Sequence, residues 1–200
     1  MTTQKFTQET LKTAAAILHA GGVVIIPTDT VYGIAAHPEK SAAVNRIRTI
    51  KGRANGKPIA LLAADKHSVI TFGAEAPPLA QALMDAFWPG ALTLVLPCGA
   101  VFEGFRVPDH PQTCTLIKAC GGTLRVTSAN LSGAMPARSA AEALKEVGLE
   151  ADLLIDDGPS PGGVASTVVQ IGRNNTLTIL REGAISAAQI HAVETKLTSQ

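Results

Sequence analysis

The sequence predicts an α/β fold built on a twisted, mixed β-sheet with flanking helices. Short β-branched runs alternate with segments whose apolar residues recur at helical spacing, and no repeat or low-complexity linker interrupts this order. Near the C-terminus, two consecutive strand-like runs flank Asn174-Asn175, a hairpin signal that argues against a purely parallel sheet. The 200 residues, 46 % of them hydrophobic, suit one domain over residues 1–200 with a sizeable core.

The first predicted helix and strand show the kind of sequence signal on which each later element is predicted. Apolar residues repeat at helical spacing over residues 10–20 until Gly21-Gly22 ends the helix. The run 23–26 is β-branched and is ended by Pro27, which predicts a buried strand. Further helices are expected at residues 41–50, 78–87, 140–147 and 186–197. Further strands are expected at residues 59–63, 92–96, 124–127, 153–155, 167–171 and 176–180.

Composition argues against several classes of protein. Charged residues make up 16 % of the chain and the net charge is +1, so nothing in the overall charge attracts nucleic acid or anionic membranes. No apolar run approaches the roughly 20 residues that span a bilayer. Lys5, Glu9 and Lys12 break any signal-peptide pattern at the N-terminus. We therefore expect a cytoplasmic protein that does not associate with membranes.

The cysteines carry no recognisable site. Cys98, Cys114 and Cys120 are odd in number and form no C-x-x-C pair, so neither a disulfide framework nor a zinc site is predicted. Thiols without a function, in a reducing compartment, are the simplest interpretation.

Residues 40–57 carry six cations and no acid. Most charge runs are solvated helix faces, and that explains Lys40 and Arg46. It explains Lys51, Arg53 and Lys57 poorly, because these three surround two glycines in a loop that leads into a strand. Glycines let backbone amides approach a ligand, and the cations supply charge, so the loop predicts a site for a polyphosphate or a carboxylate.

The same loop is not a nucleotide-binding P-loop. In "GRANGKP" only three residues separate the two glycines, whereas the P-loop needs four. Pro58 stands where that motif has its magnesium-binding hydroxyl, and the segment precedes a strand rather than a helix.

Two polar loops complete the candidate site. "PTDTVYG" (residues 27–33) and "TSANLSG" (residues 127–133) each follow a predicted strand and offer hydroxyl, carboxylate and amide groups. Either loop alone is ordinary turn chemistry. Together with the cationic loop they indicate a ligand site at the ends of strands, where α/β proteins place ligands.

Seven motifs in one order carry a family resemblance. They are "PTDTVYG", the K-x-R of Lys51 and Arg53, "WPGALT" (88–93), "RVPDHP" (106–111), "TSANLSG", "STVV" (166–169) and "LREG" (180–183). Over about residues 23–185 the chain resembles the YrdC family, the threonylcarbamoyl-AMP synthases. The resemblance implies a single YrdC-like domain with a deep, positively charged cavity.

The resemblance also implies a reaction. L-threonine, bicarbonate or CO2, and ATP with Mg²⁺ would be joined into threonylcarbamoyl-adenylate with release of pyrophosphate. A downstream transferase complex would then move the threonylcarbamoyl group to tRNAs that read codons beginning with A. No resident metal site in the protein is implied.

Site residues carry over by position. Lys51 and Arg53 would stabilise the charge on the phosphates and count as catalytic. The ATP-binding set would be Lys51, Arg53, Lys57, Asn130 and Arg181. The threonine-binding set would be Thr30, Arg106, Ser128 and Ser166, with Arg106 on the carboxylate, for which a guanidinium fork is well shaped.

Two positions depart from the pattern, and the smaller departure is Thr127, where many relatives have proline. Many relatives carry a histidine near threonine where this chain has Leu62. The threonine pocket is therefore expected to be closed differently.

Other functions stay open at this stage. A YciO-like paralogue would have the same cavity with weak or different ligation and a role in nucleotide or RNA binding. A double-stranded RNA module needs a broad basic face, which a net charge of +1 does not favour as the main role, although weak RNA binding is compatible with it. A carbamoyl-transfer domain of hydrogenase maturation would sit in a much longer chain with zinc-finger cysteines.

Overall fold

The computed structural model describes residues 2–54 and 56–198, and their strands form one sheet. The ten strands run in the order β1-β8-β2-β3-β7-β4-β6-β5-β9-β10, with four parallel and five antiparallel pairings. The predicted α/β class with a mixed sheet is confirmed. The predicted hairpin is also present, since β9 and β10 pair antiparallel.

The strands are β1 (Thr2–Lys5), β2 (Val23–Ile26), β3 (Gly33–Ala36), β4 (Leu61–Ala63), β5 (Leu92–Cys98), β6 (Val101–Arg106), β7 (Thr123–Ser128), β8 (Leu153–Asp156), β9 (Thr167–Ile171) and β10 (Leu177–Arg181). The helices are α1 (Gln8–His19), α2 (Ser41–Ile50), α3 (Lys66–Thr71), α4 (Pro78–Phe87), α5 (Pro111–Ala119), α6 (Ala140–Val147), the short 3-10 helix η1 (Gly148–Glu150) and α7 (Ala187–Thr198). No helix of the described residues is long and apolar enough to cross a membrane.

Every element expected from the sequence is present, and six further ones are not predicted: β1, β3, α3, β6, α5 and the 3-10 helix η1. Their sequences explain the difference. The strand β3 reads GIAA, with only one β-branched residue, and β6 contains a glycine and a glutamate. The helix α5 begins with proline and owes its start to His110, whose ring nitrogen accepts a hydrogen bond from the Thr113 amide.

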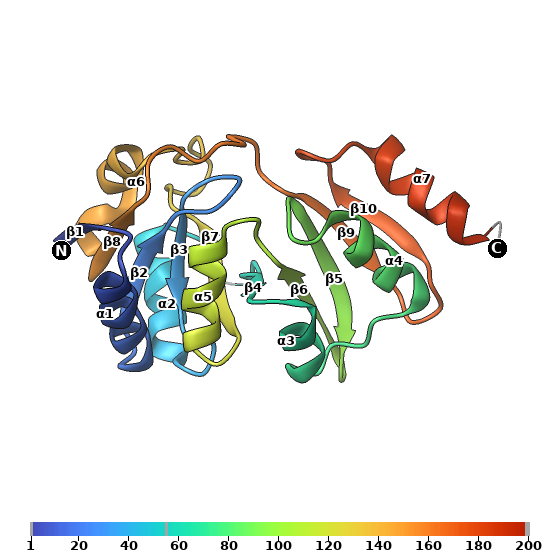
Figure 1. Cartoon of the computed structure of the whole chain (residues 1–200), viewed down its shortest axis with the longest axis horizontal. Helices are drawn as coiled ribbons and strands as arrows, with labels where there is room; N and C mark the ends of the chain where they lie inside the picture. The colour runs from blue at the N-terminus through green and yellow to red at the C-terminus, as the bar shows by residue number, and fades with distance from the viewer. Residues whose placement is uncertain (1, 55, 199–200) are drawn as a thin grey trace.

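Strand β2 shows how helices cover both faces of one half of the sheet. Val23 and Ile25 pack into a cluster with residues of α2 and α6, whereas Val24 and Ile26 pack with residues of α1 and α5. This alternation follows from the two-residue period of a strand. Figure 1 shows these four helices gathered around one end of the sheet and α4 and α7 at the other end.

The middle of the sheet, between these two groups of helices, positions the site. On one face of β5 and β6, Leu94 and Phe105 belong to the core shared with α4 and α7. The alternate residues Thr93, Val95 and Gly104 line a cavity on the other face. Pairing of Val95 with Gly104 keeps the two strands in register, so that one face is a core and the other is a binding surface.

Candidate active site

The cavity has a volume of about 360 Å³ and draws its lining from both halves of the sheet. Six of the nine residues expected at the site line it: Thr30, Arg53, Arg106, Ser128, Ser166 and Arg181. Lys51, Lys57 and Asn130 do not. The described residues that line the cavity include three arginines and no acid. That the cavity as a whole is positively charged stays a prediction.

Arg106 lies at the end of β6 and is nearly buried, at 5 % exposure. Its Nη1 contacts both carboxylate oxygens of Asp29, at 3.1 and 3.4 Å, and its Nη2 donates to Thr28 Oγ1 at 3.2 Å. Burial lowers the pKa of Arg106, and the neighbouring Asp29 charge opposes that shift. A buried guanidinium is thereby held in one orientation at the cavity wall.

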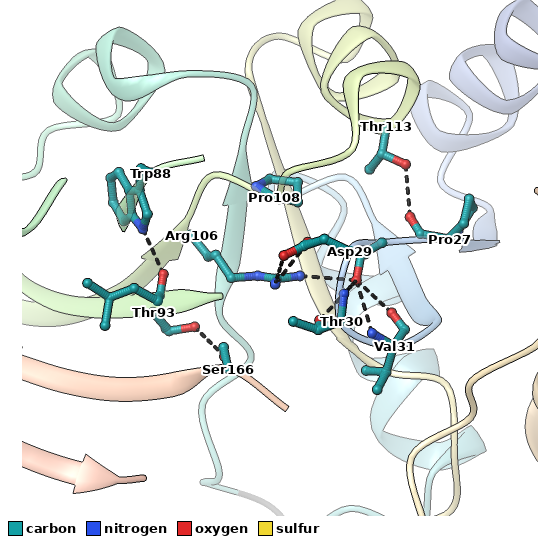
Figure 2. A network of polar contacts seen from close by, with 12 residues as sticks. Pro27, Asp29, Thr30, Val31, Trp88, Thr93, Arg106, Pro108, Thr113 and Ser166 are labelled. Carbon is teal, nitrogen blue, oxygen red and sulfur yellow. Dashed lines mark hydrogen bonds and ion pairs between the residues drawn. The ribbon is translucent and has the colours of Figure 1, made fainter. Parts of the chain in front are cut away.

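One hydroxyl forms several hydrogen bonds within the loop between β2 and β3. Thr28 Oγ1 donates to the Val31 carbonyl at 2.7 Å and accepts from the amides of Thr30 and Val31. This is the local side-chain to backbone bonding that makes threonine a turn residue. From outside the loop, Thr113 Oγ1 donates to the Pro27 carbonyl at 2.8 Å (Figure 2).

Ser166 directly precedes β9 and Arg181 ends β10, and both line the cavity. Ser166 Oγ is 2.8 Å from Thr93 Oγ1, and Arg181 Nη2 donates to the Ser166 carbonyl at 2.7 Å. Figure 2 places the Thr93 and Ser166 pair across from the Arg106 group. Sequence reasoning gave Thr93 no role, although a hydroxyl in the otherwise apolar strand "LTLVL" was a usable signal.

Arg53 reaches the cavity from the loop after α2. Its Nη2 donates to the Pro58 carbonyl at 2.9 Å, and its Nε lies 3.5 Å from the Lys57 carbonyl. Burial lowers its pKa, and the nearby charge of Arg48 adds to this effect. Lys57, by contrast, is exposed and stands outside the cavity.

Lys51 occupies a different place from the one expected. It ends α2, is 3 % exposed, and its Nζ donates to the carbonyls of Ser128 and Asn130, both at 2.5 Å. Its own carbonyl accepts from the Ser132 amide at 2.9 Å. Lys51 therefore fastens the loop after β7 and does not line the cavity in this structure, while its expected role at the phosphates stays a prediction.

Asn130 stabilises the same loop from within. Its side-chain amide donates to the carbonyls of Leu131 and Ala134, at 2.7 and 2.9 Å. Its Oδ1 is buried without a hydrogen-bond partner in the described structure. The expected contact of Asn130 with the nucleotide stays a prediction.

The buried position of Lys51 predicts a pH-dependent stability. Burial, aided by the charge of Arg53, lowers the pKa of Lys51 from 10.5 to about 8. Between these two values the unfolded chain holds a proton that the folded protein has released, so folding becomes more favourable as pH rises from 8 to 10.5. The free energy of unfolding should be measured in urea at pH 7.5, 8.5 and 9.5. From the lowest to the highest pH, it should rise for wild type by on the order of 1 kcal/mol more than for Lys51→Met. The exposed Lys57→Met is the matched control, and parallel curves for wild type and Lys51→Met would contradict the assignment.

Leu62 and the cysteines complete the description. Leu62 lines the cavity beside Arg106, with which it pairs across the parallel strands β4 and β6. All three cysteines are free. Within residues 2–54 and 56–198, no group of three or more His, Cys, Asp or Glu side chains could hold a metal ion.

Comparison with known proteins places the chain in a family. The model of the Sua5/YciO/YrdC family, described as "Telomere recombination", matches residues 16–183. The chain belongs to the Sua5/YciO/YrdC family. This confirms the family suggested by the seven motifs, and the matched region contains the whole cavity.

Several relatives of this chain are named threonylcarbamoyl-AMP synthases. It is 37 % identical over 191 residues to the threonylcarbamoyl-AMP synthase of Bacillus subtilis (strain 168), covering 90 % of this chain and 55 % of that protein. It is 34 % identical to a putative threonylcarbamoyl-AMP synthase of Mycobacterium tuberculosis (strain CDC 1551 / Oshkosh), covering 90 % of this chain and 87 % of that protein. The chain thus spans about half the length of the first relative and most of the second.

Solved structures of the family share the fold. P. abyssi Sua5 complexed with L-threonine has a TM-score of 0.88 and 30 % identity, covering 96 % of this chain and 59 % of that one. E. coli YciO has a TM-score of 0.82 and 26 % identity, covering 94 % of this chain and 96 % of that one. The mixed α/β sheet is therefore the fold of the family.

Proposed function

We propose that the protein is an L-threonylcarbamoyl-AMP synthase, a nucleotidyltransferase that joins L-threonine, bicarbonate or CO2, and ATP and releases pyrophosphate. The observation that carries the proposal is the cavity itself. It combines a buried guanidinium with hydroxyls on one side and two further guanidiniums without a carboxylate partner among the described residues. Relatives named for this activity, and a relative's structure with L-threonine, support the same assignment.

The chemistry needs cations more than it needs a general base. The threonine amine captures CO2 to give a carbamate, whose oxygen attacks the α-phosphate of ATP while pyrophosphate leaves. Negative charge gathers on the phosphate oxygens, and preorganised donors facing that charge supply most of the catalysis. We assign this role to Arg53 and Arg181, which line the cavity.

We assign the amino acid to Arg106 and to three hydroxyls of the cavity lining. Arg106 would hold the threonine carboxylate, and the hydroxyls of Thr30, Ser128 and Ser166 would read the rest of the molecule. Lys51 would be a positioning residue, because its ammonium group donates to the Ser128 and Asn130 carbonyls and so fixes the backbone that carries the Ser128 hydroxyl.

Magnesium would enter as part of the substrate. No acid lines the described cavity, and Mg²⁺ commonly keeps several waters while binding substrate phosphates. We therefore propose Mg–ATP as the form that binds. A downstream transferase complex acting on tRNA, and weak RNA binding, remain proposals from the family resemblance.

The YciO-like alternative is less well supported. Identity to the YciO structure is 26 %, compared with 34–38 % to several relatives named as synthases. A shared fold does not separate the two, because related folds carry different sites.

The deciding experiment is pyrophosphate release from Mg–ATP. Release should require both L-threonine and bicarbonate, and omission of either should bring the signal to the level without enzyme. Release that depends on neither would favour the paralogue or a binding role. Mass spectrometry of the quenched reaction should detect the threonylcarbamoyl adenylate.

A further inference from the structure

The three arginines of the cavity differ in their partners. Arg53 and Arg181 donate hydrogen bonds to backbone carbonyls. Arg181 also lies near the Ser166 hydroxyl. Arg106 is the one cavity arginine that forms an ion pair with a carboxylate in the described part of the chain. The cavity therefore has one compensated guanidinium and two uncompensated ones.

Asp29 acts from behind the cavity wall. It is absent from the lining, and only 12 % of its side chain is exposed. It occupies Nη1 of Arg106 while Thr28 occupies Nη2, and no described residue forms a hydrogen bond with Nε (Figure 2). The Nε–H and the remaining Nη hydrogens are the donors left for a ligand.

The backbone around Asp29 is fixed on both sides. The Gly162 amide donates to the Asp29 carbonyl at 2.9 Å, and the Gly163 amide donates to the Thr30 carbonyl at 2.8 Å. A Cβ at Gly162 would lie 2.7 Å from the Asp29 carbonyl oxygen, so glycine permits this close approach. The carboxylate therefore stands at a fixed place beside Arg106.

This arrangement has an electrostatic consequence. A polyphosphate carries several negative charges, and an arginine already paired with a buried carboxylate attracts it less than an unpaired arginine does. A zwitterionic amino acid has no net charge and loses little from the nearby carboxylate, while its own carboxylate still finds directed donors on Arg106.

Building on the proposed function, we propose that Asp29 is a positioning and specificity-determining residue. It orients Arg106 for an amino-acid carboxylate and screens its charge from polyphosphate, so that the triphosphate binds at Arg53 and Arg181. Two anionic ligands in one cavity are thereby directed to different guanidiniums.

The test is Asp29→Asn, which keeps the shape, removes the charge and leaves Arg106 Nη1 one acceptor oxygen where it had two, so that Arg106 is oriented less well for a carboxylate. Isothermal titration of the full chain should give an affinity for L-threonine that is about tenfold weaker and an affinity for tripolyphosphate that is about tenfold tighter. A purely structural role would weaken both ligands together, and that outcome would overturn the proposal. Unchanged affinities for both would also overturn it.

Glu103→Gln is the matched control. Glu103 lies on the same strand as Arg106 and forms a bidentate pair with Arg125, at 2.6 and 2.8 Å, outside the cavity. This variant also removes a carboxylate from an arginine pair and should leave both affinities within about twofold of wild type. A shift like that of Asp29→Asn would overturn the specific role of Asp29.

Two further measurements keep the proposal testable. If Asp29→Asn does not fold, the wild-type protein still provides a test. Saturating tripolyphosphate should leave the affinity for threonine within about twofold, because the two ligands bind to different arginines. Direct competition would overturn the proposal. If wild type neither binds threonine nor releases pyrophosphate, the proposed function fails, whereas the tripolyphosphate comparison still tests the screening by Asp29.

Discussion

Replacing Arg53 with alanine should slow adenylate formation by about 30- to 1000-fold, equivalent to about 2–4 kcal/mol in the barrier. Arg53 lines the cavity through a side chain whose hydrogen bonds go to the carbonyls of its own loop. Its charge is therefore available to a phosphate. The interaction strengthens as charge develops on the departing pyrophosphate, so kcat should fall more than KM for ATP rises.

The free energy of unfolding of Arg53→Ala should fall by no more than about 1 kcal/mol, because the side chain is only partly buried and its hydrogen bonds go to carbonyls of its own loop. Arg48→Ala is the matched control, because Arg48 lies close enough to affect the pKa of Arg53 but does not line the cavity. Pyrophosphate release at saturating threonine and bicarbonate measures the effect. Near-normal release by Arg53→Ala would remove Arg53 from the reaction.

Much of the fold followed from local sequence signals. The bounds of β2, α2, α4 and α6 match the prediction, because the three helices have a clear apolar period and β2 is a β-branched run that Pro27 ends. The strands β3 and β6 could not be predicted in this way. Their positions depend on pairing with distant strands, as Leu62 of β4 pairs with Arg106 of β6, and such pairing leaves little local trace.

The site was predictable in its membership more than in its geometry. Polar loops at strand ends and seven ordered motifs indicated six of the residues that line the cavity, together with three that do not line it. The burial of Lys51 was not predictable, because the carbonyls it bonds belong to a loop about 80 positions away in the chain. The pairing of Asp29 with Arg106 was hidden for the same reason, since it joins β6 to the loop after β2.

The choice of amino acid tests the threonine side of the cavity. Ser128 Oγ forms no hydrogen bond with a described residue, whereas the hydroxyls of Thr30 and Ser166 already lie against Thr28 and Thr93. Ser128 is therefore the hydroxyl best placed to bond that of the substrate. A site built around such a bond leaves a polar group unpaired when the ligand hydroxyl is missing.

Valine should accordingly be a much poorer substrate than threonine, with kcat/KM lower by about 10⁴-fold, whereas serine should lose only about 1–3 kcal/mol for its missing methyl. Pyrophosphate release with each amino acid at equal ATP and bicarbonate measures both ratios. Ser128→Ala should reduce the ratio of kcat/KM for threonine to kcat/KM for valine. Leu62→Ala should instead narrow the gap between threonine and serine, because Leu62 is the apolar side chain in register with Arg106. If valine served as well as threonine, the proposed pocket would be wrong, and Leu62, which lines the cavity, would be the first residue to re-examine.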